Sequence, residues 1–517
     1  MPATIHSGQS VGLKPALVRV EIDVSPGLYS FSIVGLADKA IEEAKDRLMA
    51  AIKNSRFLPP QKKNQRITVS LAPADLKKEG PVFDLAIALA YLLASKQMSF
   101  DAEGKIFLGE LGLDGTIRPV KGVLLVAREA RARGFKEIYV PKANAREAAL
   151  VRGITVYPCA SLTEITEHFL AEKENGTGTK IFFQEETIAE AKERSEDDFL
   201  FDFSDILSQE GAKRGLEIAA AGGHNVLMSG PPGTGKTMLA RAFAGILPPL
   251  SFEETLEVTA IQSVAGILVG DFVTERPFRS PHHTSSYVSL VGGGTYPKPG
   301  EVTLGHRGVL FLDEFPEFER RVIEALRQPL EDGFITVSRA KESLIFPARF
   351  ILICAMNPCP CGMKGSENRE CVCSHGDINR YEKKISGPIM DRIDIHLEVP
   401  NIKSEEMMTG GKSGDVSLEI RKRVSRAREI QTKRFKTLGR SMSSNAEMTT
   451  RDINFFIHPN EESKKILSQA VLSLGLSTRS YHRVLKLART IADLADSEEV
   501  EVKHFLEALE YRPKSKL

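Results

Sequence analysis

The length, composition and charge of the chain indicate a soluble protein of several domains. Its 517 residues are too many for one ordinary hydrophobic core, so we expect two to four domains. With 42% apolar residues, 26% charged residues and a net charge of +1, the chain is neither disordered nor coated in positive charge, although local basic patches are compatible with this balance.

The N-terminus and the longest apolar run predict a cytoplasmic protein without a membrane partner. Residues 1–14 have no basic head followed by a long apolar stretch, and the apolar run at 85–94 is too short to span a bilayer. The chain has six cysteines, four of them clustered, and this is not the pattern of a disulfide scaffold.

Residues 15–170, in the predicted first domain 1–170, alternate between strand and helix patterns. In "ALVRVEIDV" the residues Val18, Val20 and Ile22 alternate with charged ones, which predicts a half-buried strand. Further strands are predicted in "RITVSL" and "EIYVP", a hairpin turning at Asp114 and Gly115, and helices in "DKAIEEAKDRLMAAIKN", "DLAIALAYLLAS" and "KGVLLVAREARARG". The charged segment 171–200 predicts a linker, residues 201–402 a second α/β domain, and residues 403–517 a mostly helical domain.

A P-loop is the strongest motif in the sequence. An apolar strand at 226–228 precedes "GPPGTGKT", and a helical pattern follows it. The glycines let backbone N–H groups converge on phosphate oxygens, while Lys236 reaches the β and γ phosphates and Thr237 ligates Mg²⁺. The residues expected to bind the nucleotide are Gly230, Pro231, Pro232, Gly233, Thr234, Gly235, Lys236 and Thr237.

Two further apolar strands end in polar residues that suit ATP hydrolysis. The strand at 309–312 ends in Asp313, which can hold Mg²⁺, and Glu314, which can orient the attacking water. The strand in "RFILICAMN" ends in Asn357, whose amide can hydrogen-bond that water or the γ-phosphate. ATP and Mg²⁺ are therefore the expected cofactors.

Arg392, in "SGPIMDRIDI", has two interpretations. It can complete the ATP site of a neighbouring subunit, or it can form a surface ion pair with Asp391 or Asp394. The spacing alone leaves both open.

Four cysteines follow Asn357 with the spacing C-x-C, nine residues, C-x-C. They are Cys359, Cys361, Cys371 and Cys373, and four thiolates this close suit a tetrahedral structural Zn²⁺. The loop between them has no apolar core of its own, and His375 could replace one cysteine. A disulfide or a catalytic thiol is the less favoured interpretation.

Three basic segments are candidates for contact with DNA. The insertion around "RPFRSPHHTSS" is locally basic, and "GFITVSRAKESLIFPARF" predicts a hairpin with Arg339 and Lys341 at its tip. These two side chains either bind a phosphate of DNA or are solvated charges that keep the hairpin tip soluble. The basic helix at 419–436 has charges around most of its surface, which favours a solvated helix over a secondary DNA contact.

The order "GPPGTGKT", "LFLDEF", "AMNP", "GPIMDRID" and "STRSYHRVLKLART" resembles that of AAA+ ATPases of the magnesium-chelatase-like branch. It is most similar to the ComM/YifB family of bacterial competence proteins, and the match covers nearly the whole chain. The resemblance implies that Asn357 is the first sensor, Arg392 the arginine finger and Arg479 the second sensor. One departure is Ser208, where the family usually has glycine.

The resemblance also implies the fold class, which is α/β and multidomain. Residues 1–170 are expected to form a Lon-protease-like α+β domain, 201–402 a P-loop AAA+ α/β domain that carries the cysteine cluster, and 403–517 a helical C-terminal lid. A Lon-type peptidase needs a Ser–Lys dyad in its Gly-Pro-Ser-Ala segment, but here Val82 follows Gly80 and Pro81. Val126 stands at the lysine position, so we expect no peptidase activity.

The function implied by the family is ATP-driven translocation on DNA. We expect a homo-oligomeric ring, by resemblance a hexamer, that acts as a helicase or branch-migration motor on junction or forked DNA in recombination or natural transformation. The alternatives are a magnesium-chelatase motor subunit and a nucleotide-gated scaffold that does not turn ATP over. Glu314 argues against the scaffold, which would not need a carboxylate that orients water.

Overall fold

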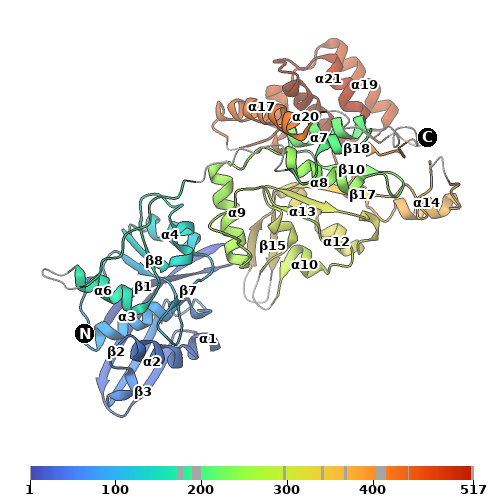
Figure 1. Cartoon of the computed structure of the whole chain (residues 1–517). Coiled ribbons are helices and arrows are strands. Elements are labelled where there is room, and N and C mark those ends of the chain that lie inside the picture. The colour runs from blue at the N-terminus through green and yellow to red at the C-terminus, as the bar shows by residue number, and fades with distance from the viewer. Residues whose placement is uncertain are drawn as a thin grey trace. The chain divides into compact units, whose positions relative to one another are not determined.

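The computed structural model describes residues 2–172, 178–188, 199–294, 298–338, 343–365, 369–402, 415–440 and 442–513. The chain folds as two compact units, shown in Figure 1. The first contains residues 1–190 and 251–274, and the second contains residues 191–250 and 275–517. Both mix helices and strands, and the last part of the second unit is helical.

A mixed seven-stranded sheet forms the centre of the first unit, in the order β3-β4-β2-β1-β5-β8-β9. β2 pairs antiparallel with β4 and with the central strand β1, whereas β1, β5, β8 and β9 are parallel to one another. The strands are β1 (Ala3–Val11), β2 (Lys14–Pro26), β3 (Ser30–Val34), β4 (Gln65–Ala72), β5 (Lys105–Phe107), β8 (Glu137–Pro141) and β9 (Thr155–Cys159), with a separate hairpin of β6 (Glu110–Leu111) and β7 (Ile117–Arg118).

The periodic patterns of the first unit fold as predicted. Val18, Val20 and Ile22 on β2 are fully buried, and the hairpin turns at Asp114 and Gly115. The helix α3 (Asp84–Ala94), which is apolar on nearly every side, is buried along almost its whole length. The other helices from residues 1–190 are α1 (Lys39–Glu42), α2 (Ala44–Asn54), α4 (Val123–Ala132), α5 (Ala145–Ala148) and α6 (Leu162–Ala171).

The sequence pattern does not predict β1, because polar residues interrupt its apolar alternation. Ser7 and Gln9 are nevertheless buried, since each side chain finds a backbone partner. The Ser7 hydroxyl donates to the carbonyl oxygen of Phe107 at 2.8 Å, and the Gln9 amide donates to that of Lys77 at 2.7 Å.

Two segments that the sequence places outside the first domain pack within the first unit. The helix α9 (Phe252–Ala265) falls within the predicted range 201–402, yet its Ser263 hydroxyl accepts the backbone N–H of Gly122 at 2.9 Å. In the predicted linker 171–200, Ile181 is buried and donates its N–H to His168 Nδ1 at 3.0 Å. Residues 173–177 and 189–198 of that linker lie outside the described residues.

Five parallel strands form the sheet of the second unit, in the order β11-β14-β17-β10-β18. Every residue of β14 and β17 is buried, as expected of parallel strands covered on both faces. The strands are β10 (Val226–Ser229), β11 (Phe278–Arg279), β14 (Val309–Leu312), β17 (Ile351–Met356) and β18 (Ile395–Glu398), with the hairpins β12 (Gly292–Gly293) to β13 (Lys298–Pro299) and β15 (Phe334–Ser338) to β16 (Ser343–Pro347).

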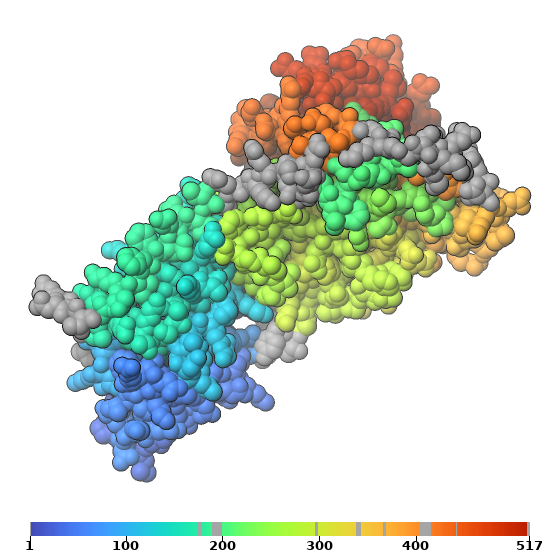
Figure 2. Space-filling model, in the orientation of Figure 1, coloured from blue at the N-terminus to red at the C-terminus, as the bar shows by residue number. Residues whose placement is uncertain are grey.

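Short and long helices connect these strands. They are α7 (Glu210–Gly222), α8 (Lys236–Ile246), α10 (Tyr287–Val291), α11 (Glu301–Leu304), α12 (Arg320–Ala325), α13 (Arg327–Asp332), α14 (His375–Glu382) and α15 (Gly387–Met390). In Figure 2 the light-orange residues around α14 form a lobe at the surface of the second unit.

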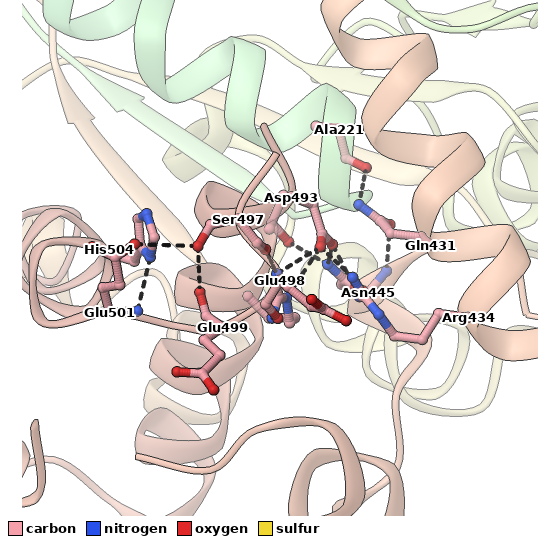
Figure 3. A network of polar contacts seen from close by, with 12 residues as sticks. Ala221, Gln431, Arg434, Asn445, Asp493, Ser497, Glu498, Glu499, Glu501 and His504 are labelled. Atoms are coloured by element: carbon pink, nitrogen blue, oxygen red, sulfur yellow. Dashed lines mark hydrogen bonds and ion pairs between the residues drawn. The ribbon is translucent and has the colours of Figure 1, made fainter. Parts of the chain in front are cut away.

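The C-terminal helices are held together by a buried polar network. The carboxylate of Asp493 is fully buried and receives N–H groups from Arg434, Asn445 and Arg489 (Figure 3). Gln431 ties this network to α7 by donating to a backbone carbonyl there at 3.1 Å. The helices are α17 (Ser417–Lys436), α18 (Thr450–Phe456), α19 (Glu461–Leu474), α20 (Thr478–Leu494) and α21 (Val502–Glu510).

The prediction of a solvated basic helix at 419–436 is wrong for one face of α17. Several of its arginines point to partners inside the unit: Arg423 pairs with Glu217 at 2.6 Å, and Arg428 donates to a carbonyl of α7 at 3.1 Å. The face that packs on the rest of the unit consists of Ile420, Val424, Ala427, Gln431 and Phe435. Arginine side chains at the edges of that face conceal the apolar stripe in the sequence.

Across the described ranges, no helix combines the length and the apolar character that a membrane span requires.

Candidate functional site

The P-loop follows β10 at the edge of the sheet where the carboxyl ends of its parallel strands meet. Ligands of open α/β sheets bind at this edge. Gly230 lies so close to the neighbouring chain that a Cβ atom there would be 2.1 Å from the carbonyl oxygen of Val399. Gly233 and Gly235 have φ angles of +81° and +88°, which side chains rarely adopt. These glycines let the backbone wrap tightly in front of α8.

Lys236, at the start of α8, is buried and points back into the loop. Its ammonium group donates to the carbonyl oxygens of Gly230 and Pro231, both at 2.7 Å, and lies 3.5 Å from Asn357 Oδ1. Burial lowers its pKa, and the nearby Asp313 partly opposes this effect. The P-loop lysine and the polar end of β17 are therefore brought together, as the sequence predicts.

The end of β14 supplies two acidic groups beside the P-loop. The hydroxyl of Thr237 donates to Asp313 Oδ2 at 2.8 Å, so the two oxygen ligands expected for Mg²⁺ are adjacent. Glu314 has a φ of +50°, a left-handed conformation that costs a non-glycine residue about 1–3 kcal/mol and that clusters at functional sites.

Glu314 also has a partner that the sequence pattern does not identify. His283 Nδ1 lies 3.1 Å from Glu314 Oε2, and the His283 ring packs edge-on against Phe318. The sequence indicates only that His283 is one of several basic residues in an insertion. Because 31 residues separate the two side chains and no motif links them, this contact is visible only in the fold.

The cysteine-bearing loop contacts the P-loop directly. Gly362, with a φ of +78°, lies where a Cβ would be 2.9 Å from Pro232 Cδ and 3.8 Å from Asn357 Cγ. The loop that follows Asn357 therefore packs on the exposed Pro232 of the P-loop.

The four cysteines of this loop converge as predicted. Their sulfur atoms all lie within 4.8 Å of one another. The Sγ atoms of Cys359, Cys361 and Cys371 form a triangle with sides of 3.4, 3.6 and 3.6 Å. Sulfur atoms bound to one tetrahedral zinc at about 2.3 Å are about 3.8 Å apart, so the spacing fits that metal. His375 is not in the cluster of potential ligands among the described residues.

Arg392 pairs with neither Asp391 nor Asp394, the two partners considered from the sequence. It is buried, and its guanidinium donates to the carbonyl oxygen of Pro388 at 2.7 Å and to the carboxylate of Glu331. Arg479 donates to the other oxygen of the same carboxylate.

The backbone around Arg392 is fixed by polar groups that are buried or partly buried. Its carbonyl oxygen accepts from Asn225 and Arg483, both at 3.0 Å, and Arg483 also pairs with the buried Asp394. Burial alone would raise the pKa of Asp394, but Arg483, His224 and the N–H of Asn225 together lower it well below its usual range.

Of the basic segments predicted to contact DNA, one forms the expected hairpin, and another has arginines that bind partners within the protein. The hairpin β15–β16 forms as predicted, but Arg339 and Lys341 at its tip lie outside the described residues. In the other insertion, Arg276 donates to the carbonyl oxygens of Pro248 at 2.6 Å and Pro249 at 3.2 Å, and Arg279 pairs with Glu301 at 2.6 Å. These two arginines are engaged within the protein.

In the first unit, the two positions at which the resemblance to Lon-type peptidases would place a Ser–Lys dyad are buried and apolar. Val82 is 8% exposed and Val126 is 1% exposed. In the second unit Ser208, at the position where glycine is usual in the family the sequence resembles, has a φ of +56°, which explains why glycine suits that position.

Comparison with known proteins assigns all three regions of the chain to one family. The family model "Magnesium chelatase, subunit ChlI" matches residues 202–407, "Subunit ChlI of Mg-chelatase" matches 20–144, and "Magnesium chelatase, subunit ChlI C-terminal" matches 414–512. The chain is 42% identical to competence protein ComM of Haemophilus influenzae over 99% of this chain and 97% of that protein. It is 42% identical to YifB of Escherichia coli over 98% and 96%, and 29% identical to the DNA repair protein RadA of Aquifex aeolicus over 32% and 36%.

Proposed function

Because the chain belongs to the magnesium-chelatase family and is similar to ComM over almost its whole length, we propose that it is a ring-forming AAA+ ATPase that moves DNA. In this proposal residues 201–402 are the AAA+ core and 403–517 its lid, while 1–170 form a Lon-protease-like domain without peptidase activity. The observation that carries the ATPase assignment is the convergence of Lys236, the Thr237–Asp313 pair and Asn357 at one edge of the parallel sheet.

Each residue of this site has a role that follows from its chemistry. Lys236 would leave the two carbonyl oxygens that it now contacts and bind the β and γ phosphates. Thr237 and Asp313 supply hard oxygen ligands for Mg²⁺. Glu314 would orient the attacking water, and Asn357, within reach of the lysine, would contact the γ-phosphate.

The positions of two arginines support the proposal of a ring. Within the described residues, neither Arg392 nor Arg479 has a hydrogen bond or ion pair to residues 230–237 of its own chain. An arginine that stabilises the charge of the transferred phosphate can also be supplied by a neighbouring subunit. We therefore assign the catalytic role of both arginines to a homo-oligomer, with a hexamer as the expected number of subunits.

The proposal that the partner is DNA rests on the similarity to the relatives and on the β15–β16 hairpin. The relatives include a competence protein and a DNA repair protein, and β15–β16 carries Arg339 and Lys341 at its tip. Basic side chains that reach phosphates bind without sequence preference, as a motor on junction or forked DNA requires. Branch migration during recombination or natural transformation is the activity that we propose.

The family match keeps one alternative open, a motor subunit of a magnesium chelatase. The cysteine loop does not decide between a DNA motor and a chelatase motor, because it packs on the P-loop, and both motors need a P-loop. We propose that Cys359, Cys361, Cys371 and Cys373 bind a structural Zn²⁺, since their sulfur spacing fits a tetrahedral site.

The test is ATP hydrolysis by the whole chain with no DNA, with duplex DNA and with a four-way junction. We expect stimulation by the junction and strand exchange that depends on ATP. Turnover that no DNA stimulates, but that rises with a porphyrin-binding partner subunit, would favour the chelatase alternative.

A further inference from the structure

Glu331 joins two arginines that lie far apart in the sequence. It is the penultimate residue of α13, and its two carboxylate oxygens accept from Arg392, 61 residues later, and from Arg479, 148 residues later. The three side chains come from α13, from the segment after α15 and from α20. One carboxylate therefore connects three separate parts of the second unit.

The charges explain why this arrangement needs the carboxylate. Two guanidinium groups that share one acceptor are close enough to repel each other, and an anion between them offsets that repulsion. Partial burial would raise the pKa of Glu331, but hydrogen bonds and charge from Arg392 and Arg479 lower it, so the carboxylate is ionised at neutral pH.

The contacts also restrict where the two guanidinium groups can lie. One amino group of Arg392 is anchored on the carbonyl oxygen of Pro388 at 2.7 Å and another on Glu331, so its planar guanidinium is fixed at two edges. Arg479 is 41% exposed at its side chain, and Glu331 is the only ion-pair partner it has among the described residues. Without Glu331, Arg479 would lose this ion pair.

We propose that Glu331 is a positioning residue that aligns Arg392 and Arg479 as one pair toward the phosphates of a neighbouring subunit's ATP. This inference rests on the proposed ring ATPase. It adds that one glutamate, through its contacts with both side chains, sets the orientation of the two arginines.

The test compares Glu331→Gln and Glu331→Asp with the wild-type chain in steady-state ATP hydrolysis. Misplacing a catalytic group by about 1 Å costs about 100-fold in rate, so Glu331→Gln should lower kcat by roughly 10- to 100-fold with KM changed only a few-fold. Glu331→Asp keeps the charge and should recover part of the loss.

Glu419→Gln, which removes a similarly exposed glutamate paired with Lys422 on α17, is the matched control and should retain wild-type turnover. A rise in turnover in Glu331→Gln would mean that the glutamate restrains the arginines, and would overturn the proposal.

Mixed rings separate positioning in trans from damage to the fold. Subunits carrying Glu331→Gln keep a complete P-loop, and subunits carrying Lys236→Ala keep both arginines and Glu331. Mixing the weakly active Glu331→Gln chain with the inactive Lys236→Ala chain should therefore create active interfaces and restore hydrolysis above that of either alone. The reference mixture is Arg392→Ala with Lys236→Ala. If the reference regains activity and the Glu331→Gln mixture does not, the inference about Glu331 is wrong while the ring ATPase stands. If the reference also stays inactive, the proposed function itself fails.

Discussion

Gly362 offers the sharpest test of whether the cysteine loop supports the nucleotide site. We predict that Gly362→Ala weakens ATP binding, because the new Cβ would lie 2.9 Å from Pro232 Cδ in the P-loop. Ordinary contacts of this kind are 3.4–4 Å, so the two loops must separate by several tenths of an ångström. A proline ring atom cannot rotate away, so the backbone of the P-loop or that of the cysteine loop must move.

The size of the effect follows from the cost of overpacking. Inserting a methyl group into a packed contact costs about 1–3 kcal/mol. If ATP binding has to restore the position of the P-loop, a cost of that size weakens ATP affinity by about 5- to 150-fold. The φ of +78° adds about 1–2 kcal/mol of backbone strain, which acts on folding stability whether or not ATP is bound.

The same loop provides the control. Gly365 has the same φ of +78°, but a Cβ there would meet nothing within 4 Å. Gly365→Ala therefore carries the backbone strain without the contact, and should leave ATP affinity close to wild type. The assay is titration of each variant with a fluorescent ATP analogue, together with thermal unfolding. Equal ATP affinities in the two variants would refute the idea that this loop supports the P-loop.

Three further predictions concern other parts of the second unit. Glu314→Gln should bind ATP but lose turnover by about 100- to 10,000-fold in a hydrolysis assay, and unchanged turnover would remove its assignment as the water-orienting residue. Cys371→Ser should lower the zinc content from about one ion per chain to near zero by elemental analysis, whereas wild-type protein that contains no zinc when purified without chelators would exclude the metal. Asp493→Asn should destabilise the unit by about 3–5 kcal/mol in chemical unfolding, because Arg434 and Arg489 then lose their buried counter-ion; a loss below about 1 kcal/mol would contradict this.

Local patterns predict much of this fold because they depend on neighbours in the sequence. The alternation of Val18, Val20 and Ile22 and the wholly apolar β14 and β17 each report burial directly, and the P-loop needs its glycines in one short stretch. The strand β1 cannot be predicted in this way. Ser7 and Gln9 are buried only because backbone carbonyls of distant segments accept their hydrogen bonds. For the same reason the sequence cannot assign α9 to the first unit, where Ser263 meets Gly122.

The residues of the candidate site also differ in whether local patterns can place them. Residues that sit at the ends of apolar strands, such as Asp313 and Asn357, can be placed from the strand pattern, because parallel strands end at a common edge. Arg392 cannot be understood in that way, since the spacing suggests Asp391 or Asp394 as partners and the fold supplies Glu331 instead. A charged residue in a short helix such as α13 has no pattern that marks it as functional.

The position of Glu331 gives it a second connection. Directly after α13, the carbonyl oxygen of Gly333 accepts the N–H of Ala348 at 2.8 Å and closes the base of the β15–β16 hairpin. The hairpin proposed to contact DNA and the glutamate that holds the two arginines are thus separated by a single turn of chain. A shift of the hairpin base by DNA would reach Glu331 through only two residues, Asp332 and Gly333, and would change how the arginines face the neighbouring ATP. If so, Glu331→Gln should reduce the stimulation of hydrolysis by junction DNA more strongly than it reduces hydrolysis without DNA. An equal reduction of both rates would separate the arginine pair from the hairpin.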